Sequence, residues 1–285
     1  MDNADYASAA GADAPDPDAP DAAASAADVP GGDASSEPPR SAAQEWWEMG
    51  KSVVIALLIA LVIRTLLFQP FTIPSGSMEP TVLPGDYVII TKYSYGYSRF
   101  SLPIALPLFQ GRLFDRVPQR GDIIVFKLPR DNKTDYIKRL IGLPGDKIQV
   151  TRGVVYVNGQ ALPRQELSPG TELGPFDQTR PVQRFQETML NGRSYVTNSY
   201  GPDGEADNTG VYVVPAKSYF FMGDNRDNSA DSRFPSDQGV GYVPEANLVG
   251  RASFVLLSWT DKASIFKPWT WLLDLRPSRF FHALH

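Results

Sequence analysis

The chain has 285 residues, 42% of them hydrophobic and 21% charged, so it can bury one sizeable core or a core with a smaller appended unit. It contains no cysteine, which excludes disulfides, thiolate nucleophiles, zinc–thiolate sites and iron–sulfur clusters. Its two histidines, His282 and His285, lie in the last four residues, where chains usually fray. A Ser–His–Asp triad or a histidine-bound metal is therefore not expected, and any serine nucleophile must use another base.

The net charge of −5 is unevenly distributed, because residues 1–45 carry ten acidic side chains and one basic side chain, Arg40. This segment is mostly Ala, Asp, Pro, Ser and Gly, which cannot bury enough apolar surface to fold, and we predict a disordered acidic tail. A docking tail is the functional alternative. No basic stripe interleaved with aromatic residues follows, so nucleic-acid binding is not expected, whereas a weakly basic body can approach anionic lipids.

Residues Ser52–Phe68 form an apolar run, interrupted near its end by Arg64 and Thr65. With Lys51 the run would make about 27 Å of helix, close to the roughly 30 Å hydrocarbon core of a bilayer. We predict a transmembrane anchor over residues 46–69, with Arg64 snorkelling to the interface. A buried helix of a soluble core is the alternative. A cleaved signal peptide is disfavoured, because a long polar tail precedes the run and no small-x-small site follows it. The flanking charges do not determine orientation.

After the anchor, short β-branched and aromatic runs alternate with turn residues, which predicts a mainly β fold. We expect an antiparallel-sheet or barrel-like domain over residues 70–265, preceded by one transmembrane helix. Residues 161–210 are rich in Pro, Gly, Asn, Asp and Gln, with weak strands, and are predicted to be an inserted smaller β region. The C-terminal segment 266–285 is aromatic, and we expect it to close the core or to contact the membrane surface. The predicted strands are Asp86–Tyr93, Asp122–Leu128, Tyr136–Gly142, Asp146–Thr151, Val154–Asn158, Val211–Val214, Tyr219–Met222 and Ala252–Trp259, and the C-terminal aromatic residues are Trp269, Trp271, Phe280 and Phe281.

Three polar segments, Thr72–Thr81, Asp135–Asp146 and Met222–Arg233, carry the candidate chemistry. Each alone has an ordinary explanation: a Ser-Gly-Ser loop, a solvated lysine on an edge strand, and a solvated or calcium-binding loop. The third lacks the spacing and terminal glutamate of an EF-hand loop, and its arginines oppose a cation. Lys138 and Arg139 are neighbours on a predicted strand and should diverge, so that one points inward. Burial would lower the pKa of Lys138 and let its neutral amine act as a base.

Together the segments are far more specific. The strings IPSGSMEPT, RGDIIVF, YIKRLIGLPGD and GDNRDNSADSR resemble, in order, the boxes of the bacterial type I signal peptidases, and the resemblance runs from the anchor to about Trp259. It implies a membrane-bound serine endopeptidase that removes N-terminal signal peptides from exported pre-proteins after a small-x-small motif. The implied partners are those signal peptides and the lipid bilayer. No metal or other cofactor is expected.

The resemblance also implies a role for each candidate residue. Ser77 would be the nucleophile and Lys138 its general base, while Ser75 would join the Ser77 backbone N–H in an oxyanion hole. Ser229 would orient the lysine amine. An ion pair between Asp231 and Arg233 would brace the loop, and four residues would line pockets for alanine-sized side chains: Ile73, Pro74, Tyr136 and Ile137.

The same chemistry implies a topology. Signal peptides emerge on the outer side of the bacterial inner membrane, so the body should lie on the periplasmic side and the N-terminus in the cytoplasm, with a single pass. Proteobacterial members of the family often carry two anchors, whereas one is visible here. Two alternatives remain: a self-cleaving repressor with the same Ser/Lys pair, and an inactive membrane-anchored binding module. The absence of a DNA-binding domain disfavours the first, and the complete set of catalytic positions disfavours the second.

Overall fold

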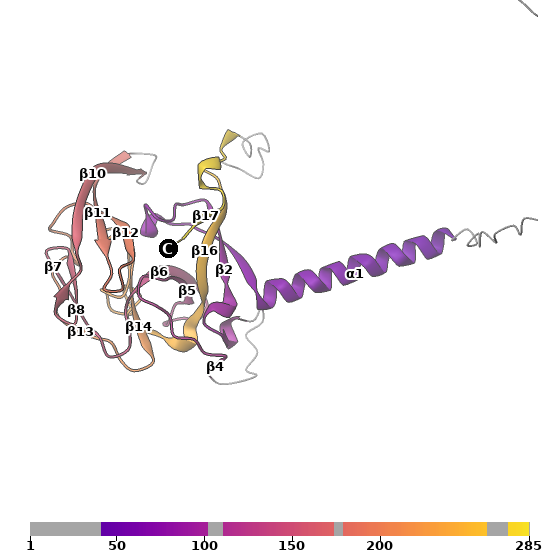
Figure 1. The fold of residues 1–285 in the computed structure, drawn as a ribbon, viewed down its shortest axis with the longest axis horizontal. Coiled ribbons are helices and arrows are strands. Elements are labelled where there is room, and N and C mark those ends of the chain that lie inside the picture. Colours follow the sequence, from indigo (N-terminus) through magenta and orange to yellow (C-terminus); the bar gives the residue numbers. More distant parts are fainter. Residues whose placement is uncertain (1–40, 102–110, 174–178, 261–272, 285) are drawn as a thin grey trace, which may run out of the picture. The chain divides into compact units, whose positions relative to one another are not determined.

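The computed structural model describes residues 41–101, 111–173, 179–260 and 273–284 (Figure 1). Most of the predicted acidic tail therefore lies outside the described residues, as do Trp269, Trp271 and His285. Internal contacts divide the chain into residues 1–49 and residues 50–285. Every described β-strand belongs to the second unit.

Helix α1 spans Ala42–Leu66 and is the one helix among the described residues that is long and apolar enough to cross a membrane. It begins with a reciprocal cap, in which the Gln44 N–H donates to Ser41 Oγ at 3.3 Å and the Ser41 N–H donates to Gln44 Oε1 at 3.0 Å. The predicted anchor began later, at residue 46, and ended later, at residue 69. The helix ends earlier because strand β1 begins at Phe68 and pairs with β2.

The main sheet is antiparallel and has the strand order β1-β2-β16-β5-β6-β14-β15, with β17 paired to β16. The last strand, β17, comes from the C-terminal segment, so the described end of that segment extends the sheet, and Leu284 is buried in its core. The bounds are β1 Phe68–Thr72, β2 Asp86–Thr91, β5 Ile123–Lys127, β6 Asp135–Gly142, β14 Ser218–Met222, β15 Val243–Pro244, β16 Leu248–Ser258 and β17 His282–Ala283.

Strand β16 curls the sheet, because its pairing with β2 and β5 contains three register shifts. Bulges of this kind bend a strand and increase its twist. Gly250 stands at the shift towards β5, where a Cβ atom would lie 2.6 Å from the Thr91 carbonyl oxygen. The glycine thus permits the close approach of two backbones that the curled strand requires.

Apolar side chains cover both faces of this sheet. Along β5, Ile123 and Val125 belong to one buried cluster, whereas Ile124 and Phe126 belong to another. Successive residues of a strand point to opposite faces, so this strand is buried on both sides, and for that reason its first four residues form an unbroken apolar run.

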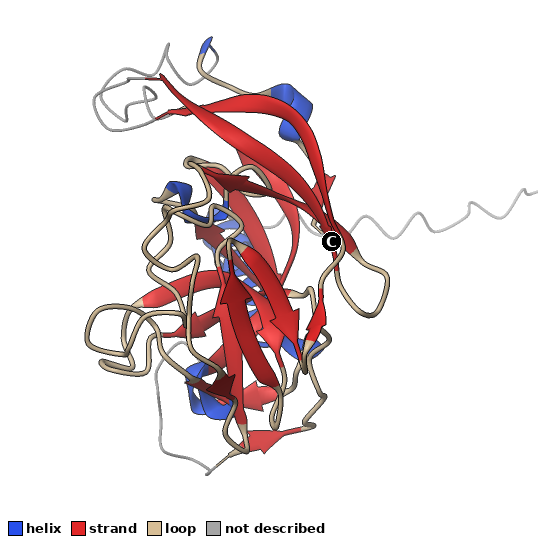
Figure 2. Cartoon of the chain, turned by 90° about the vertical axis from the view of Figure 1, so that its left-hand side faces the viewer, coloured by secondary structure: helices blue, strands red, loops and turns tan. Residues whose placement is uncertain are grey.

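Three smaller sheets complete the described fold, in which strands predominate after α1 (Figure 2). The range 161–210 contains a three-stranded sheet with two ten-residue strands, where the sequence predicted only weak ones. These two strands were not predicted because they are rich in polar residues and lack the apolar runs that mark the strands of the main sheet. The mainly β, antiparallel fold class is confirmed.

The smaller sheets are β10 Arg164–Leu173, β11 Thr179–Thr188 and β12 Ser194–Ser199; β13 Tyr212–Val213, β7 Lys147–Thr151, β8 Val154–Val157 and β9 Gln160–Ala161; and β3 Tyr97–Ser98 with β4 Arg112–Leu113.

Candidate active site

Ser77 lies in a single turn of 3₁₀ helix, Gly76–Met78, between β1 and β2. Prolines at 74 and 80 flank the turn, and proline disfavours helical conformation in the residue before it, so the turn stays short. Lys138 comes from the middle of β6, directly opposite Ile124 of β5. The fold therefore brings together a loop and a central strand that are 61 residues apart in sequence.

Lys138 Nζ lies 2.6 Å from Ser77 Oγ and also donates to the Ile137 carbonyl oxygen at 3.0 Å. The lysine side chain is 3% exposed, and its amine stands 5.5 Å from the centre of the Tyr136 ring. Burial lowers the pKa of Lys138 from 10.5 to about 8, although the negative charge of Asp231 acts in the opposite direction. With this pKa, about a tenth of the amines are neutral at pH 7 and about half at pH 8.

The sequence predicted that Lys138 and Arg139 diverge and that one of them points inward, and the structure buries both side chains. Elements pack against both faces of the sheet, so a strand residue finds no solvent on either side. Arg139 is accommodated by a bidentate ion pair with Asp224, through Nε to Oδ1 at 2.8 Å and Nη2 to Oδ2 at 2.7 Å. The Thr81 hydroxyl also donates to Asp224 Oδ2, at 2.5 Å. This pair ties β6 to the loop that follows β14.

The Ser75 hydroxyl lies 3.4 Å from Ser77 Oγ and is exposed to solvent. Ser229 lies next to Gly223, as does the Ser77 carbonyl. A Cβ atom on Gly223 would lie 2.3 Å from Ser229 Oγ and 2.4 Å from the Ser77 carbonyl oxygen. Ser229 Oγ is buried and has no hydrogen-bond partner among the described residues.

Asp231 and Arg233 form a buried ion pair on the same loop. Arg233 Nε and Nη2 each donate to one carboxylate oxygen of Asp231 at 2.9 Å. The Gly223 N–H also donates to Asp231 Oδ2 at 2.9 Å, so the pair fixes both the start and the end of the loop. Burial alone would raise the pKa of the Asp231 carboxyl, but the positive charge of Arg233, together with the hydrogen bonds from Arg233 and the Gly223 N–H, holds it below its usual range.

The four predicted pocket residues have unlike environments. Ile73 and Ile137 are buried in one apolar cluster, together with Met78 from the turn of the nucleophile. Pro74 is exposed, and Tyr136 is half-buried against Phe126. They all lie within two residues of Ser75 or Lys138 along the chain.

A third buried ion pair was not predicted, because one of its partners lies within residues 161–210, the range predicted to be an inserted region. Arg226, in the loop after β14, bonds both carboxylate oxygens of Glu187 on β11. The density of Asp, Asn and Arg between 222 and 233 by itself has the ordinary explanation of a solvated loop, so it points to no partner for Arg226. Nothing in the sequence around Glu187 identifies it as one, since the pairing depends on the tertiary fold.

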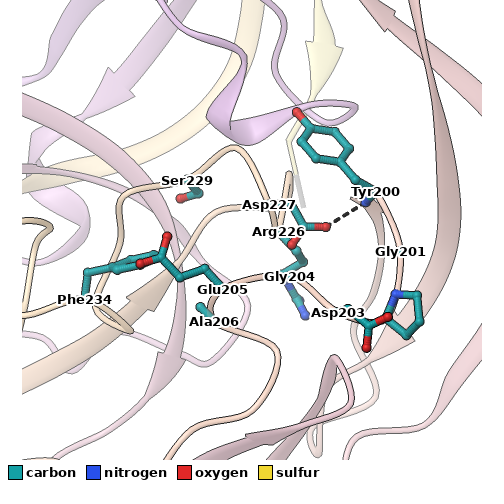
Figure 3. Close-up of a pocket in the computed structure, with 11 residues that line it drawn as sticks. Tyr200, Gly201, Asp203, Gly204, Glu205, Ala206, Arg226, Asp227, Ser229 and Phe234 are labelled. Carbon is teal, nitrogen blue, oxygen red and sulfur yellow. Dashed lines mark hydrogen bonds between the residues drawn. The ribbon is translucent and has the colours of Figure 1, made fainter.

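A cavity of about 480 Å³ opens between the loop after β14 and the end of the inserted region (Figure 3). Ser229 and Asp227 line one part of it, and the segment Tyr200–Ala206 lines another. The Asp227 carboxylate accepts the Tyr200 N–H at 2.6 Å and thereby joins the two walls. Among the described residues, no group of three or more His, Cys, Asp or Glu side chains is arranged to hold a metal ion.

Comparison with known proteins agrees with these observations. Residues 46–259 match the family model described as signal peptidase, peptidase S26. A signal peptidase I of Rickettsia typhi is 44% identical over 251 residues, covering 82% of this chain and 92% of the relative. A signal peptidase I of Rickettsia akari is 41% identical over 267 residues, covering 86% and 94%. A solved signal peptidase I from Enterococcus faecalis is 29% identical, covers 48% of this chain and 98% of its own, and superimposes with a TM-score of 0.28. The resemblance in the sequence is thus confirmed, and the chain belongs to the bacterial type I signal peptidase family.

Proposed function

We propose that this protein is a membrane-bound serine endopeptidase that removes N-terminal signal peptides from exported pre-proteins after a small-x-small motif, with Ser77 as nucleophile and Lys138 as general base. The 2.6 Å separation between Ser77 Oγ and the buried Lys138 amine carries the proposal. A general base must lie within hydrogen-bond reach of the proton that it removes, and its pKa should lie near the working pH. Lys138, with a pKa lowered to about 8, meets both conditions.

The reaction follows from this pair. Ser77 Oγ attacks the scissile carbonyl carbon while its proton passes to Lys138 Nζ, and a tetrahedral intermediate forms. The Lys138 ammonium then donates that proton to the leaving amine, and the mature protein departs with the new N-terminus. A water molecule, deprotonated by the same amine, hydrolyses the acyl-enzyme and releases the signal peptide. The proposed reaction uses no cofactor.

Two further serines support the pair. The oxyanion would be held by the Ser77 backbone N–H and the Ser75 hydroxyl, and loss of one such donor typically costs about 10² to 10³ in rate. Ser229 would orient the Lys138 amine. Its buried hydroxyl has no hydrogen-bond partner among the described residues, the Lys138 amine included, and because a buried hydroxyl without a partner costs free energy, a bond to that amine during the reaction would be favoured.

Small side chains of the signal peptide would occupy pockets beside the nucleophile. Ile73, Pro74, Tyr136 and Ile137 stand next to the catalytic residues in sequence, and their apolar side chains suit alanine-sized groups. Asp231 and Arg233 would act structurally, by holding the loop that carries Ser229.

Helix α1 would anchor the enzyme in the bacterial inner membrane with a single pass. Because signal peptides are cleaved after translocation, the body would lie on the periplasmic side and the N-terminus in the cytoplasm. The helix ends at Leu66, and the short segment between Leu66 and Ser77 would keep the nucleophile close to the bilayer surface.

The direct test is cleavage of a pre-protein by the full-length enzyme in detergent, followed by the size of the product. Ser77→Ala and Lys138→Ala should each abolish cleavage. Ser168→Ala and Lys133→Ala, at exposed positions, serve as matched controls and should cleave normally. Activity retained in either of the first two variants would disprove the mechanism.

Orientation is tested separately, by adding a protease to spheroplasts that express the full chain. The body should be digested and an N-terminal tag should be protected. Protection of the body with digestion of the tag would reverse the proposed topology.

A further inference from the structure

Asn225 contacts two successive carbonyl groups, those of Gly76 and Ser77, in the turn that carries the nucleophile. Its backbone N–H donates to the Ser77 carbonyl oxygen at 3.2 Å, and its side-chain Nδ2 donates to the Gly76 carbonyl oxygen at 3.2 Å. The residue is fully buried. One side chain and its own backbone thus hold two successive peptide groups.

The bond to Gly76 bears directly on the oxyanion hole. The Gly76 carbonyl and the Ser77 N–H belong to the same planar peptide unit, so a donor that fixes the carbonyl also fixes the direction of the N–H. A hydrogen bond to the carbonyl oxygen further polarises the peptide and strengthens its N–H as a donor. Asn225 therefore acts on the group that would stabilise the tetrahedral intermediate.

Glu172 holds the Asn225 amide in place. Glu172 Oε2 accepts from Asn225 Nδ2 at 2.5 Å, and Glu172 Oε1 accepts the Tyr200 hydroxyl in a short hydrogen bond. A carboxylate acceptor makes a hydrogen bond shorter and stronger than a neutral one does. Glu172 is buried and comes from β10 of the inserted region, so an element outside the main sheet reaches the nucleophile through one amide group.

A second carboxyl group stands on the same turn. Glu79 is buried, and its Oε1 lies 2.8 Å from the position that a Cβ atom on Gly76 would take. Burial and the charge of Glu172 raise the pKa of Glu79 from 4.5 to about 7. The Gly76 carbonyl oxygen also accepts the Glu79 backbone N–H at 3.1 Å, within the turn itself, so the Asn225 side chain is the donor that reaches this carbonyl from outside the turn.

We propose that Asn225 and Glu172 are positioning residues for the oxyanion hole: Glu172 holds the Asn225 amide against the Gly76 carbonyl, and this bond aims the Ser77 N–H at the developing oxyanion. The inference rests on the proposed serine mechanism and deepens it. It also assigns the inserted region a part in catalysis, because the carboxylate comes from β10.

The expected effects fall on the chemical step. Asn225→Ala should lower kcat by about 10- to 100-fold, less than the loss of a complete oxyanion donor, and leave KM nearly unchanged. Glu172→Gln keeps an acceptor oxygen but loses its charge, so kcat should fall by less than about 10-fold. Glu166→Gln, an exposed glutamate on the same strand, is the matched control and should behave as the unmodified enzyme.

A double-variant cycle separates positioning from a structural role. If Glu172 acts through Asn225, then Glu172→Gln should cost nothing further in an Asn225→Ala background. A peptide aldehyde, whose adduct with Ser77 places an oxygen in the oxyanion site, should lose affinity in step with kcat/KM. Uncleaved pre-protein should bind Ser77→Ala equally well with or without Asn225→Ala. The pH at which activity is half-maximal should not move, because Lys138 is untouched.

Other outcomes would overturn the proposal. A rise in KM at unchanged kcat would assign Asn225 to substrate binding, and fully additive losses would make Glu172 independent of Asn225. Should Asn225→Ala fail to fold, the kcat of Glu172→Gln and its affinity for the peptide aldehyde decide the question alone. If Glu172→Gln binds the aldehyde normally but is less stable, Glu172 has only a structural role. Cleavage that survives Ser77→Ala would instead mean that the proposed function had failed.

Discussion

Arg226 and Glu187 face each other in a buried bidentate ion pair, with the guanidinium Nη1 and Nη2 atoms 2.8 Å and 2.5 Å from the two carboxylate oxygens. The pair joins the loop after β14 to strand β11 of the inserted region. The Tyr195 hydroxyl donates to the same carboxylate at 3.0 Å. The loop that carries Ser229 is therefore held by charges from a part of the chain about 40 residues earlier.

Replacing Glu187 by alanine should destabilise the protein strongly, because the Arg226 guanidinium would stay buried without its counter-charge. Loss of one partner of a buried pair typically costs about 3 to 5 kcal/mol. Denaturant unfolding of the detergent-solubilised protein measures the change, with the exposed Glu166→Ala as control. A loss of less than about 1 kcal/mol in the free energy of unfolding would show that the ion pair does not hold the loop in place.

Gly223→Ala should reduce activity far more than it reduces stability. The added methyl group would lie 2.4 Å from the Ser77 carbonyl and 2.3 Å from Ser229 Oγ, so both must shift. Displacement of a nucleophile by about 1 Å can cost on the order of 10²-fold in rate. Steady-state cleavage rates measure this effect, and Gly210→Ala, where a methyl group meets open space, is the control. Normal cleavage by Gly223→Ala would contradict the close packing.

Cleavage should increase as the pH rises through about 8. The reactive form of Lys138 is the neutral amine, and burial lowers its pKa to about 8, so protonation removes the base below that value. The pH dependence of kcat/KM measures the pKa of this base. Lys92 is also buried, with a pKa lowered to about 8, so Lys92→Met is the necessary control and should leave the profile unchanged. A half-maximal pH near 10.5 would mean that Lys138 is not desolvated during the reaction.

The same shift makes a prediction about stability. Unfolded lysine holds its proton up to about 10.5, whereas native Lys138 loses it near 8, so the unfolded state binds more protons between these values. The contribution of Lys138 to stability should therefore increase with pH over this range. Comparing the unfolding free energy of Lys138→Met with that of the unmodified protein at pH 8 and pH 10 tests the sign. A difference that does not change with pH would contradict it.

The Glu79 carboxyl group should have the opposite effect on how stability depends on pH. Its pKa is raised from 4.5 to about 7, so the native state binds more protons between these values, and stability falls as the pH rises through them. Glu79→Gln should therefore stabilise the protein more at pH 8 than at pH 4.5, by about 1 to 3 kcal/mol. Unfolding midpoints at the two pH values measure the difference, and an equal effect at both would mean that Glu79 stays charged.

Much of this protein was predictable because local chemistry carried the information. The apolar run ending near Phe68, the alternation of the main strands, and the order of the Ser77, Lys138 and Ser229 segments are all visible in the sequence, since each depends on residue types close together in the chain. Because both histidines lie in the last four residues, the sequence also indicated that any serine nucleophile would use a base other than histidine.

What only the tertiary structure decided are the relationships between distant segments. The two long strands of the inserted region were missed because their polar pattern has no apolar period, and they are ordered by pairing with each other and with β12. Likewise, no sequence pattern pairs Glu187 with Arg226 or Glu172 with Asn225. The burial that lowers the pKa of Lys138 depends on two covered faces of one sheet, and a property of packing cannot be read from the order of residues along a strand.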